Sequence, residues 1–483
     1  MRMPMNGTFQ RLTVSSHIQQ LQFNFRHAER RVSTRILRTL LFSALAVVTI
    51  SGTASAQSHY TFTSIANLND YAGYFETATL TNADDVLFAP ALLTGGEGVL
   101  LWHHGTINPI AQGGQPTLDT GWCWPPTVPS DCPVFGFTLS PVQMNERGDV
   151  AFGMSRDGIN NWPSPDGINA GVYRYNSHTG VVPVMVPGMP APSGGSFWGA
   201  WYFVSVPNNG DIYFTGIVCT TAAVKYTAQP CPEGPGVLAH GVYRSDPRGN
   251  ITAEVKPGDA APGRSYFDFA NQPAGNERGD MLFAGHIYSD PCNPRPDLGG
   301  CWRSLFLKDG QSGRIVTVAR IGDPAPRPGK IYTSAGTTTL NAAGDVAFLA
   351  DFSPANDFSD DAVLFRTHGR TMVIAEVGDV MPDGETLAKV GTAGQNIAIN
   401  NAGDIVFDAT LTDSTQAIYL WRYGRLSLVA KTGTHTSAGI ISDFDDLGTG
   451  WASTQVWIND FGQILFAAHF QEGGGAMFVA TPH

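Results

Sequence analysis

Two histidines and one aspartate occupy equivalent positions of a recurring segment, and their side chains are suited to proton transfer or metal binding. The position lies three residues after a recurrent phenylalanine, and its occupants are Ala91, Ser155, Ile217, His286, Asp351, Thr410 and His469. His286 and Asp351 belong to consecutive copies, so they can form an acid–base pair or half of a metal site. The alternative is that these side chains are hydrogen-bonded structural residues.

Tryptophans gather in the long segments between the copies. They are Trp122, Trp124, Trp162, Trp198 and Trp302, with Trp451 close by. Tryptophan can stack on a sugar ring or pack a loop onto a sheet, and the sequence does not distinguish these roles. We therefore take Trp122, Trp124, Trp162 and Trp302, together with His286, Asp351 and His469, as candidate ligand-binding residues.

Aspartates cluster in two further segments, and Ca²⁺ is the cofactor that they could hold. The clusters are Asp357, Asp360 and Asp361, and Asp443, Asp445 and Asp446. Ca²⁺ requires several oxygen ligands, but DFDDLG lacks the alternation of an EF-hand loop. Solvated loop charge is the alternative, so no residue is assigned to a metal and no other cofactor is expected.

Short catalytic signatures are absent from the sequence. It contains no HExxH, no GxSxG, no CxxC and no phosphate-cradling glycine loop. No catalytic residue is therefore assigned. The absence does not exclude an enzyme, because propeller enzymes assemble their sites from distant loops.

The elements that must position these residues come from one segment repeated seven times. The copies are LTNADDVLF (80–88), MNERGDVAF (144–152), VPNNGDIYF (206–214), GNERGDMLF (275–283), LNAAGDVAF (340–348), INNAGDIVF (399–407) and INDFGQILF (458–466). Their final phenylalanines are spaced by 64, 62, 69, 65, 59 and 59 residues. That period suits a four-stranded sheet.

Each copy predicts a tight turn followed by a strand. Asn341 can cap the turn, Gly344 can take positive φ, and Asp345 re-enters extended chain. Val346 and Phe348 are two residues apart, so they lie on the same side of the strand. A second β-rich element, such as AVLFR (362–366), follows every copy. We expect one face of every sheet to be apolar at this position.

A third element follows only the first six copies, and its missing counterpart stands at the other end of the chain. SIANLND (64–70) aligns with TVARIGD (317–323). A closed ring explains this permutation, because the first strand can complete the last sheet. The sequence therefore predicts an all-β, seven-bladed β-propeller over residues 57–483, with the N-terminal strand closing the last blade.

The long insertions all fall on one face of this propeller, opposite the NxxG turns. A binding site is therefore expected on the long-loop face. All six cysteines lie there, and sequence proximity favours the pairs Cys123–Cys132, Cys219–Cys231 and Cys292–Cys301 among the 15 possible connectivities. Such disulfides fit an exported protein.

Residues 1–56 read as a secretory signal peptide with a long basic beginning. An 11-residue apolar run, 40–50, precedes small residues at Ala54 and Ala56. Without this segment 22 basic and 40 acidic residues remain, a formal charge of −18, which argues against nucleic acid. We expect a secreted, extracellular or periplasmic monomer without a membrane span.

The copies resemble the NxxGxxxAF tandem repeats of secreted bacterial proteins that carry varied C-terminal anchors. The likeness is close in MNERGDVAF and LNAAGDVAF and covers essentially all of residues 57–483. It implies a scaffold repeat without known activity, so no catalytic residues carry over. We expect a binding or interaction module that holds a glycan or an extracellular protein. The alternative is a secreted polysaccharide lyase or hydrolase with its site on the same face.

Overall fold

The computed structural model describes residues 60–72, 75–116, 134–157, 170–192, 194–225, 230–231, 235–290, 304–352, 362–391, 396–444 and 456–483. His59–His483 forms one compact unit. The predicted signal peptide, residues 1–56, lies outside the described residues. Within the described part of the chain, no helix is long and apolar enough to cross a membrane.

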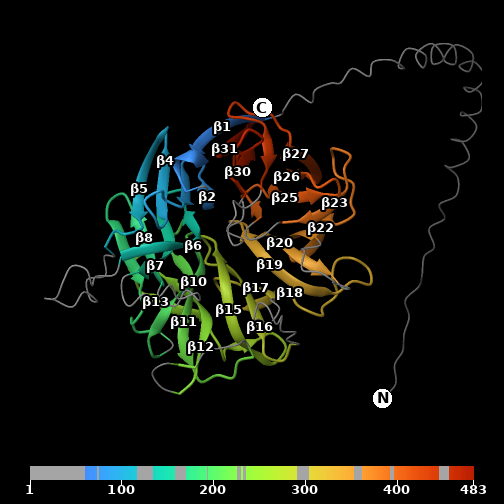
Figure 1. Ribbon diagram of the computed structural model, residues 1–483. Coiled ribbons are helices and arrows are strands. Elements are labelled where there is room, and N and C mark those ends of the chain that lie inside the picture. Colours follow the sequence, from blue (N-terminus) through green and yellow to red (C-terminus); the bar gives the residue numbers. More distant parts are fainter. Residues whose placement is uncertain are drawn as a thin grey trace, which may run out of the picture. The chain divides into compact units, whose positions relative to one another are not determined.

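Seven antiparallel sheets make up the unit, and they confirm the predicted seven-bladed β-propeller (Figure 1). Blade 1 contains β2 (Phe75–Leu80), β3 (Val86–Pro90), β4 (Gly98–His103) and β5 (Thr106–Gln112). Blade 2 contains β6 (Val134–Met144), β7 (Val150–Asp157), β8 (Ala170–Asn176) and β9 (Gly180–Met185). Blade 3 contains β10 (Phe197–Ser205), β11 (Ile212–Thr220), β12 (Val237–Ser245) and β13 (Ile251–Val255).

The next three blades repeat this order, with one additional short strand in two of them. Blade 4 contains β14 (Ala260–Ala261), β15 (Ser265–Gly275), β16 (Met281–Ile287), β17 (Ser304–Lys308) and β18 (Ile315–Ala319). Blade 5 contains β19 (Tyr332–Leu340), β20 (Val346–Phe352), β21 (Ala362–Thr367) and β22 (Arg370–Glu376). Blade 6 contains β23 (Leu387–Val390), β24 (Ile397–Ile399), β25 (Ile405–Leu411), β26 (Gln416–Arg422) and β27 (Arg425–Lys431).

Blade 7 joins the two ends of the described chain, as the permuted repeat predicts. It contains β28 (Ile441–Asp443), β29 (Trp457–Ile458), β30 (Ile464–Phe470), β31 (Gly475–Pro482) and β1 (Tyr60–Asn67). β1 pairs antiparallel with β31, from Tyr60 opposite Pro482 to Asn67 opposite Ala476. A single-turn 3-10 helix, η1 (Leu68–Asp70), follows β1. The pairing leaves no open edge between the first and last copies of the repeat.

The recurrent phenylalanine explains how the blades pack. Each copy contributes one phenylalanine to a different interblade core, and all seven are at most 1% exposed. Between blades 4 and 5, for example, Phe348 and Val346 pack against Leu282 and Leu305. The two-residue spacing thus places both side chains in the same core, as predicted.

Candidate functional site

The asparagine that opens each NxxG turn forms hydrogen bonds both within its own blade and to the next blade. In blade 6, Asn400 Oδ1 accepts from the backbone N–H groups of Ala402 at 3.0 Å and Asp404 at 2.9 Å. Its Nδ2 donates to Asp404 Oδ2 at 3.2 Å and to the carbonyl oxygen of Asn459 in blade 7 at 3.0 Å. One buried amide therefore fixes the turn and couples two blades.

The same coupling recurs around the ring. Five side-chain amides each donate to a backbone carbonyl of the next blade, at 3.0 to 3.2 Å. The pairs are Asn145 with Pro207, Asn276 with Asn341, Asn341 with Asn400, Asn400 with Asn459, and Asn459 with Thr81. Thr81 and Pro207 occupy the asparagine position in blades 1 and 3 and have no side-chain amide. Between blades 3 and 4, Ser205 Oγ instead accepts from the Gly275 N–H at 3.1 Å. The asparagine of the NxxG repeat therefore links five of the seven pairs of neighbouring blades, in addition to their apolar cores.

A second ring is formed by the residue after the asparagine position, which we call the rim. Its members are Asn82, Glu146, Asn208, Glu277, Ala342, Asn401 and Asp460. Side-chain oxygens in this ring accept backbone N–H groups from the preceding blade, as from Asn82 N to Glu146 Oε2 at 2.8 Å. Asn401 N to Asp460 Oδ1 and Asp460 N to Asn82 Oδ1, both 2.8 Å, continue the pattern. These carboxylates and amides are therefore held at defined positions.

Six of the seven rim residues, all except Asn82, line a cavity of about 180 Å³ at the centre of the ring, on the NxxG-turn face. Glu146, Glu277 and Asp460 line it, and no lysine, arginine or histidine of the described residues does so. We call this cavity the axial pocket. Its wall includes the side chains two residues before the asparagine position, which are Gln143, Ser205, Ala274, Thr339, Ala398 and Trp457.

Two residues that line the axial pocket have unusual backbone conformations. Phe203 has φ of 82° and Gln272 has φ of 53°, where non-glycine residues are uncommon. Both lie at irregularities in the pairing of β10 with β11 and of β15 with β16. Gln272 Oε1 and Thr339 Oγ1 are buried atoms without a hydrogen-bond partner among the described residues. Strained backbone and unsatisfied acceptors in one pocket are typical of a binding site.

The electrostatics of the axial pocket favour neutral or positive ligands. Burial raises the pKa of the Glu146 carboxyl, and the nearby charges of Asp460 and Asp85 raise it further. The Asn82 N–H bond opposes this rise. Three carboxyl groups around one small opening therefore create a negative field without a compensating cation among the lining residues.

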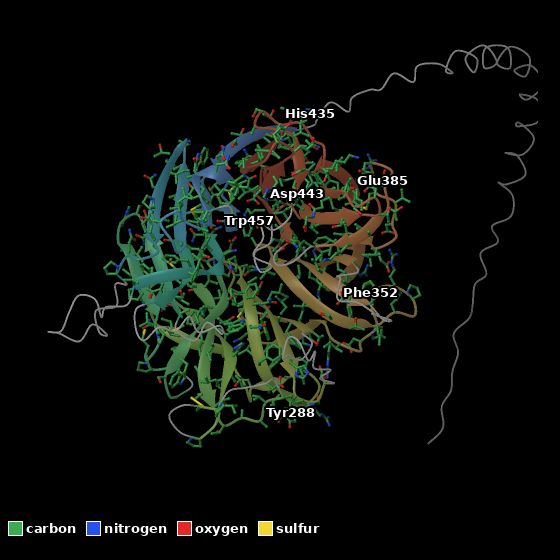
Figure 2. All side chains as sticks on the ribbon, in the orientation of Figure 1. Tyr288, Phe352, Glu385, His435, Asp443 and Trp457 are labelled. Atoms are coloured by element: carbon green, nitrogen blue, oxygen red, sulfur yellow. A yellow bond between two sulfur atoms is a disulfide. The ribbon has the colours of Figure 1, made fainter. Side chains whose placement is uncertain are left out.

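Trp457 provides the aromatic surface of the axial pocket. It lies on β29, close to the centre of the ring of blades (Figure 2). It packs against the cores between blades 6 and 7 and between blades 7 and 1. Contacts on both sides hold this half-buried indole in place.

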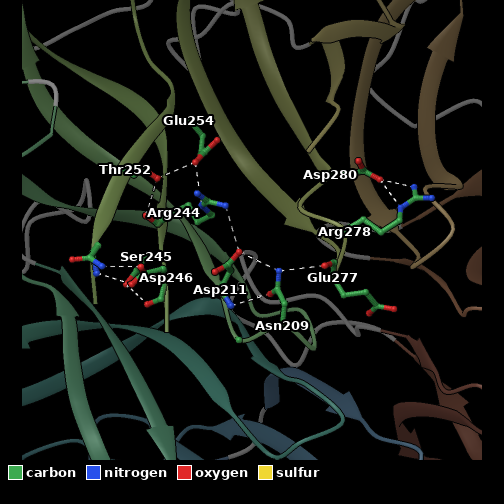
Figure 3. Close-up of polar contacts among 12 residues, drawn as sticks. Asn209, Asp211, Arg244, Ser245, Asp246, Thr252, Glu254, Glu277, Arg278 and Asp280 are labelled. Atoms are coloured by element: carbon green, nitrogen blue, oxygen red, sulfur yellow. Dashed lines mark hydrogen bonds and ion pairs between the residues drawn. The ribbon is translucent and has the colours of Figure 1, made fainter. Parts of the chain in front are cut away.

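Charged residues outside the axial pocket support the turns that carry the rim (Figure 3). Arg244 lies between Glu254, at 3.2 Å, and Asp211, at 3.6 Å. Asn209 Nδ2 donates to Asp211 Oδ2 at 3.1 Å and to the Glu277 carbonyl at 3.5 Å (Figure 3). The turn of blade 3 is thereby tied to the rim residue of blade 4.

The predicted acid–base candidates occupy different interblade layers. His286 and Asp268 are both fully buried, and His286 Nδ1 lies 2.9 Å from Asp268 Oδ1, so its carboxylate partner is Asp268 and not Asp351. Strand alternation places His286 on the blade 5 side of β16 and Asp351 on the blade 6 side of β20. His469 is half-buried and pairs with Asp443 across β30 and β28. None of the three lines the axial pocket.

The predicted long-loop site falls largely outside the described residues. Trp122, Trp124, Trp162, Trp302 and Trp451 lie there, as do Cys123, Cys132, Cys292, Cys301 and the aspartates at 357, 360, 361, 445 and 446. The predicted disulfide Cys219–Cys231 is confirmed, with a Cα–Cα distance of 5.8 Å. Trp198 packs with Cys231 in a small apolar cluster. Among the described residues, no group of three or more metal-ligating side chains is assembled.

One sequence pattern points to the axial pocket, but it lies within the NxxG turn, where polar residues are expected in any case. The position after the asparagine is polar in six of the seven copies, although a turn does not require this. Comparing this position among the seven copies identifies the rim residues. The bulges at Phe203 and Gln272 carry no comparable signal.

Comparisons with known proteins assign a family without an activity. The profile of a family of unknown function, DUF7453, matches residues 232–479. No curated protein sequence matches the chain.

Similar solved structures include TolB from Acinetobacter baumannii, with a TM-score of 0.34, 12% identity, and coverage of 69% of this chain and 59% of TolB. A puromycin-hydrolysing peptidase from Mycobacterium tuberculosis has a TM-score of 0.46, 12% identity, and coverage of 86% and 53%. A PL25 ulvan lyase bound to -[GlcA(1-4)Rha3S]- has a TM-score of 0.39, 12% identity, and coverage of 86% and 93%. The chain thus spans little more than half of TolB and of the peptidase.

Proposed function

We propose that this protein, which belongs to the DUF7453 family of unknown function, is a binding module whose axial pocket holds one sugar residue of a neutral or amine-bearing glycan. The observation that carries this proposal is the composition of the pocket. Amides and three carboxyl groups line a cavity of about 180 Å³. Trp457 forms part of its wall, and no basic side chain is among the lining residues.

Size favours a small ligand. Pockets for drug-sized molecules occupy about 300–1,000 Å³, and the axial pocket is smaller. A single hexose ring offers hydroxyl groups that donate and accept within such a space. The amides of Gln143 and Asn208 can donate to a hydroxyl oxygen, and these amides and the Glu277 carboxylate can accept a hydrogen bond from a hydroxyl group.

Charge selects among sugars. A uronic acid or a sulfated sugar would bring an anion next to Glu146, Glu277 and Asp460, and the repulsion would weaken binding. An amino sugar brings a cation and gains from the same field. The expected affinity of otherwise similar monosaccharides is therefore highest for a cationic sugar and lowest for an anionic one.

This assignment moves the proposed site from the long-loop face to the NxxG-turn face. An extracellular or periplasmic location remains part of the proposal, and it is supported by the Cys219–Cys231 disulfide. A tandem-repeat scaffold without its own chemistry is also consistent with turns whose asparagines, such as Asn341 and Asn400, are used in interblade hydrogen bonds.

A matched series of monosaccharides tests the proposal. We expect glucosamine to bind at least as tightly as glucose, and glucuronate to bind least, by calorimetry or ligand-detected NMR at low salt. Glu277→Gln should reduce the preference for glucosamine. Glu472→Gln, at an exposed residue outside the pocket lining, is the control and should leave the order unchanged. Tighter binding of glucuronate, or no binding by any of the three, would refute the proposal.

The raised pKa of Glu146 beside Asp460 supports a second candidate, a glycoside hydrolase. Such enzymes use one protonated and one ionised carboxyl group on either side of the scissile bond. Release of reducing ends from a neutral polysaccharide, abolished by Glu146→Gln, would favour this candidate. Binding without turnover would favour the module.

A further inference from the structure

Two strongly exposed aromatic side chains belong to loops on the NxxG-turn face. Tyr423 is 86% exposed, the highest value among the large hydrophobic side chains that the structure describes, and Phe461 is 67% exposed. Neither contributes to an interblade core among the described residues. Their exposure has no evident role in folding, and exposed aromatic surface commonly marks a binding site.

The two aromatic residues belong to neighbouring loops in blades 6 and 7. Phe461 directly follows the rim residue Asp460. Tyr423 lies in the hairpin between β26 and β27, next to Arg422. A Cβ atom added at Gly462 would overlap Nη2 of Arg422, so the hairpin and the NxxG turn of blade 7 are in direct contact. Phe461 is therefore next in sequence to a residue that lines the axial pocket, and the hairpin of Tyr423 touches the same turn through Arg422.

The hairpin that carries Tyr423 is held in place. Arg422 bonds Asp404 Oδ2 through Nε at 2.9 Å and through Nη2 at 2.8 Å. Asp404 is 4% exposed and belongs to the NxxG turn of its own blade. Two donors of one guanidinium on a single oxygen of a buried carboxylate fix the hairpin before any ligand arrives, which lowers the cost of binding.

The backbone of Tyr423 has a conformation that costs stability for a tyrosine. Its φ is 51°, in the left-handed region where glycine and asparagine are better accommodated. Histidines occupy equivalent turns at His104, φ 47°, and His368, φ 50°. A bulky ring that is both strained and exposed suggests a role in binding.

We propose that Phe461 and Tyr423 form a second subsite, on which the sugar residues following the one in the axial pocket stack. The ligand is then an oligosaccharide that runs outward from the rim over blades 7 and 6. This inference rests on the proposed function of the axial pocket. Flat aromatic faces accept the apolar faces of pyranose rings without selecting among their charges.

The inference can be tested by comparing the affinities of the full chain for glucosamine and for its β-1,4-linked trimer. We expect the trimer to bind the unaltered protein about tenfold more tightly than the monomer. Phe461→Ala and Tyr423→Asn should each remove most of this gain and leave the monomer affinity unchanged. Tyr423→Asn should also raise Tm slightly, because asparagine tolerates the left-handed region. His368→Asn, at the same turn position in blade 5, is the matched control and should not affect the trimer.

The outcomes separate the inference from the proposed function. If the trimer binds no more tightly than the monomer, or if both aromatic variants retain the gain, the second subsite is refuted and the axial pocket stands. If trimer binding is lost in Phe461→Ala but unaffected by Glu277→Gln, the aromatic subsite stands and the pocket assignment fails. If neither sugar binds, both are refuted.

Discussion

The side-chain amide of Asn459 donates to the carbonyl oxygen of Thr81 at 3.1 Å, although 378 residues separate them. This bond links the turn of the last blade to the corresponding turn of the first blade. It acts in parallel with the pairing of β1 and β31, which closes the ring of blades at its outer edge. Blade 7 is thus fixed to blade 1 near the axis and completed from the N-terminal side at the periphery.

Replacing Asn459 by alanine should destabilise the protein more than an ordinary polar substitution. The variant removes the acceptor of the Phe461 and Gln463 N–H groups and one of two donors to the Thr81 carbonyl, at a side chain that is 3% exposed. We expect a loss of about 2–4 kcal/mol in the free energy of unfolding. Asn108→Ala, on the exposed strand β5, is the control in urea denaturation. Equal effects of the two variants would contradict the structural role of the ring.

Thr81→Asn should have the opposite effect. Thr81 occupies the asparagine position of blade 1 and lacks an amide with which to reach the Asn145 carbonyl. The substituted amide can restore the missing link between blades 1 and 2, with an expected gain of about 1 kcal/mol. A higher urea midpoint with an unchanged m-value would support this, whereas a lower midpoint would show that the turn of blade 1 cannot accept the larger side chain.

Gly344 is expected to tolerate alanine less well than Gly369 does. Both have positive φ, 83° and 75°, so each substitution costs about 1 kcal/mol of backbone strain. Gly369 faces open space, but a Cβ atom at Gly344 would overlap Nη2 of Arg278 and displace it from Asp280. The additional cost at Gly344 should disappear in an Arg278→Ala background. A cost that persists there would place the restriction elsewhere in the turn.

Stability should depend on pH through Glu146. Burial raises its pKa above the value of 4.5 for an unfolded glutamate, so folding disfavours the ionised form. The penalty is absent below pH 4.5, where the carboxyl is protonated in both states, and it is complete once the pH exceeds the raised pKa. Stability therefore falls as pH rises through this interval.

Glu146→Gln keeps an acceptor for the Asn82 N–H and removes the charge. Its Tm should match that of the unaltered protein at acid pH and exceed it at neutral pH. Scanning calorimetry across this range measures the difference. Parallel pH profiles for the two proteins would mean that the ionised form of Glu146 carries no folding penalty.

His286→Ala should destabilise the fold without weakening the axial pocket. His286 and Asp268 are fully buried, and the ring of His286 stacks on Phe269 at 6.1 Å. Removing the imidazole leaves a cavity and takes one partner from a buried carboxylate, so we expect a loss of about 3–5 kcal/mol. His286→Gln should recover part of it. Glucosamine affinity per folded molecule is the second readout, and a selective loss of affinity would give His286 a direct role in binding.

The architecture was predictable because its signals recur. Phe348 and its six counterparts mark the interblade cores, and the displaced strand at Ser64 reveals how the ring closes. The axial pocket was not predictable in the same way, because Glu146 and Asp460 are distant in sequence and become neighbours of Asn82 only in the closed ring. The partner of His286 was missed because an irregularity between Phe267 and Phe269 sets the place of Asp268.

The partnership of β1 with β31 imposes an order of events on biosynthesis. The first strand of the ring cannot find its neighbour until the ribosome has added Gly475 and the residues after it. Until then β1 lacks the strand with which it pairs, and an unpaired strand is prone to aberrant association. A chaperone that covers β1 during this delay would therefore prevent its association with the wrong strand until β31 is synthesised.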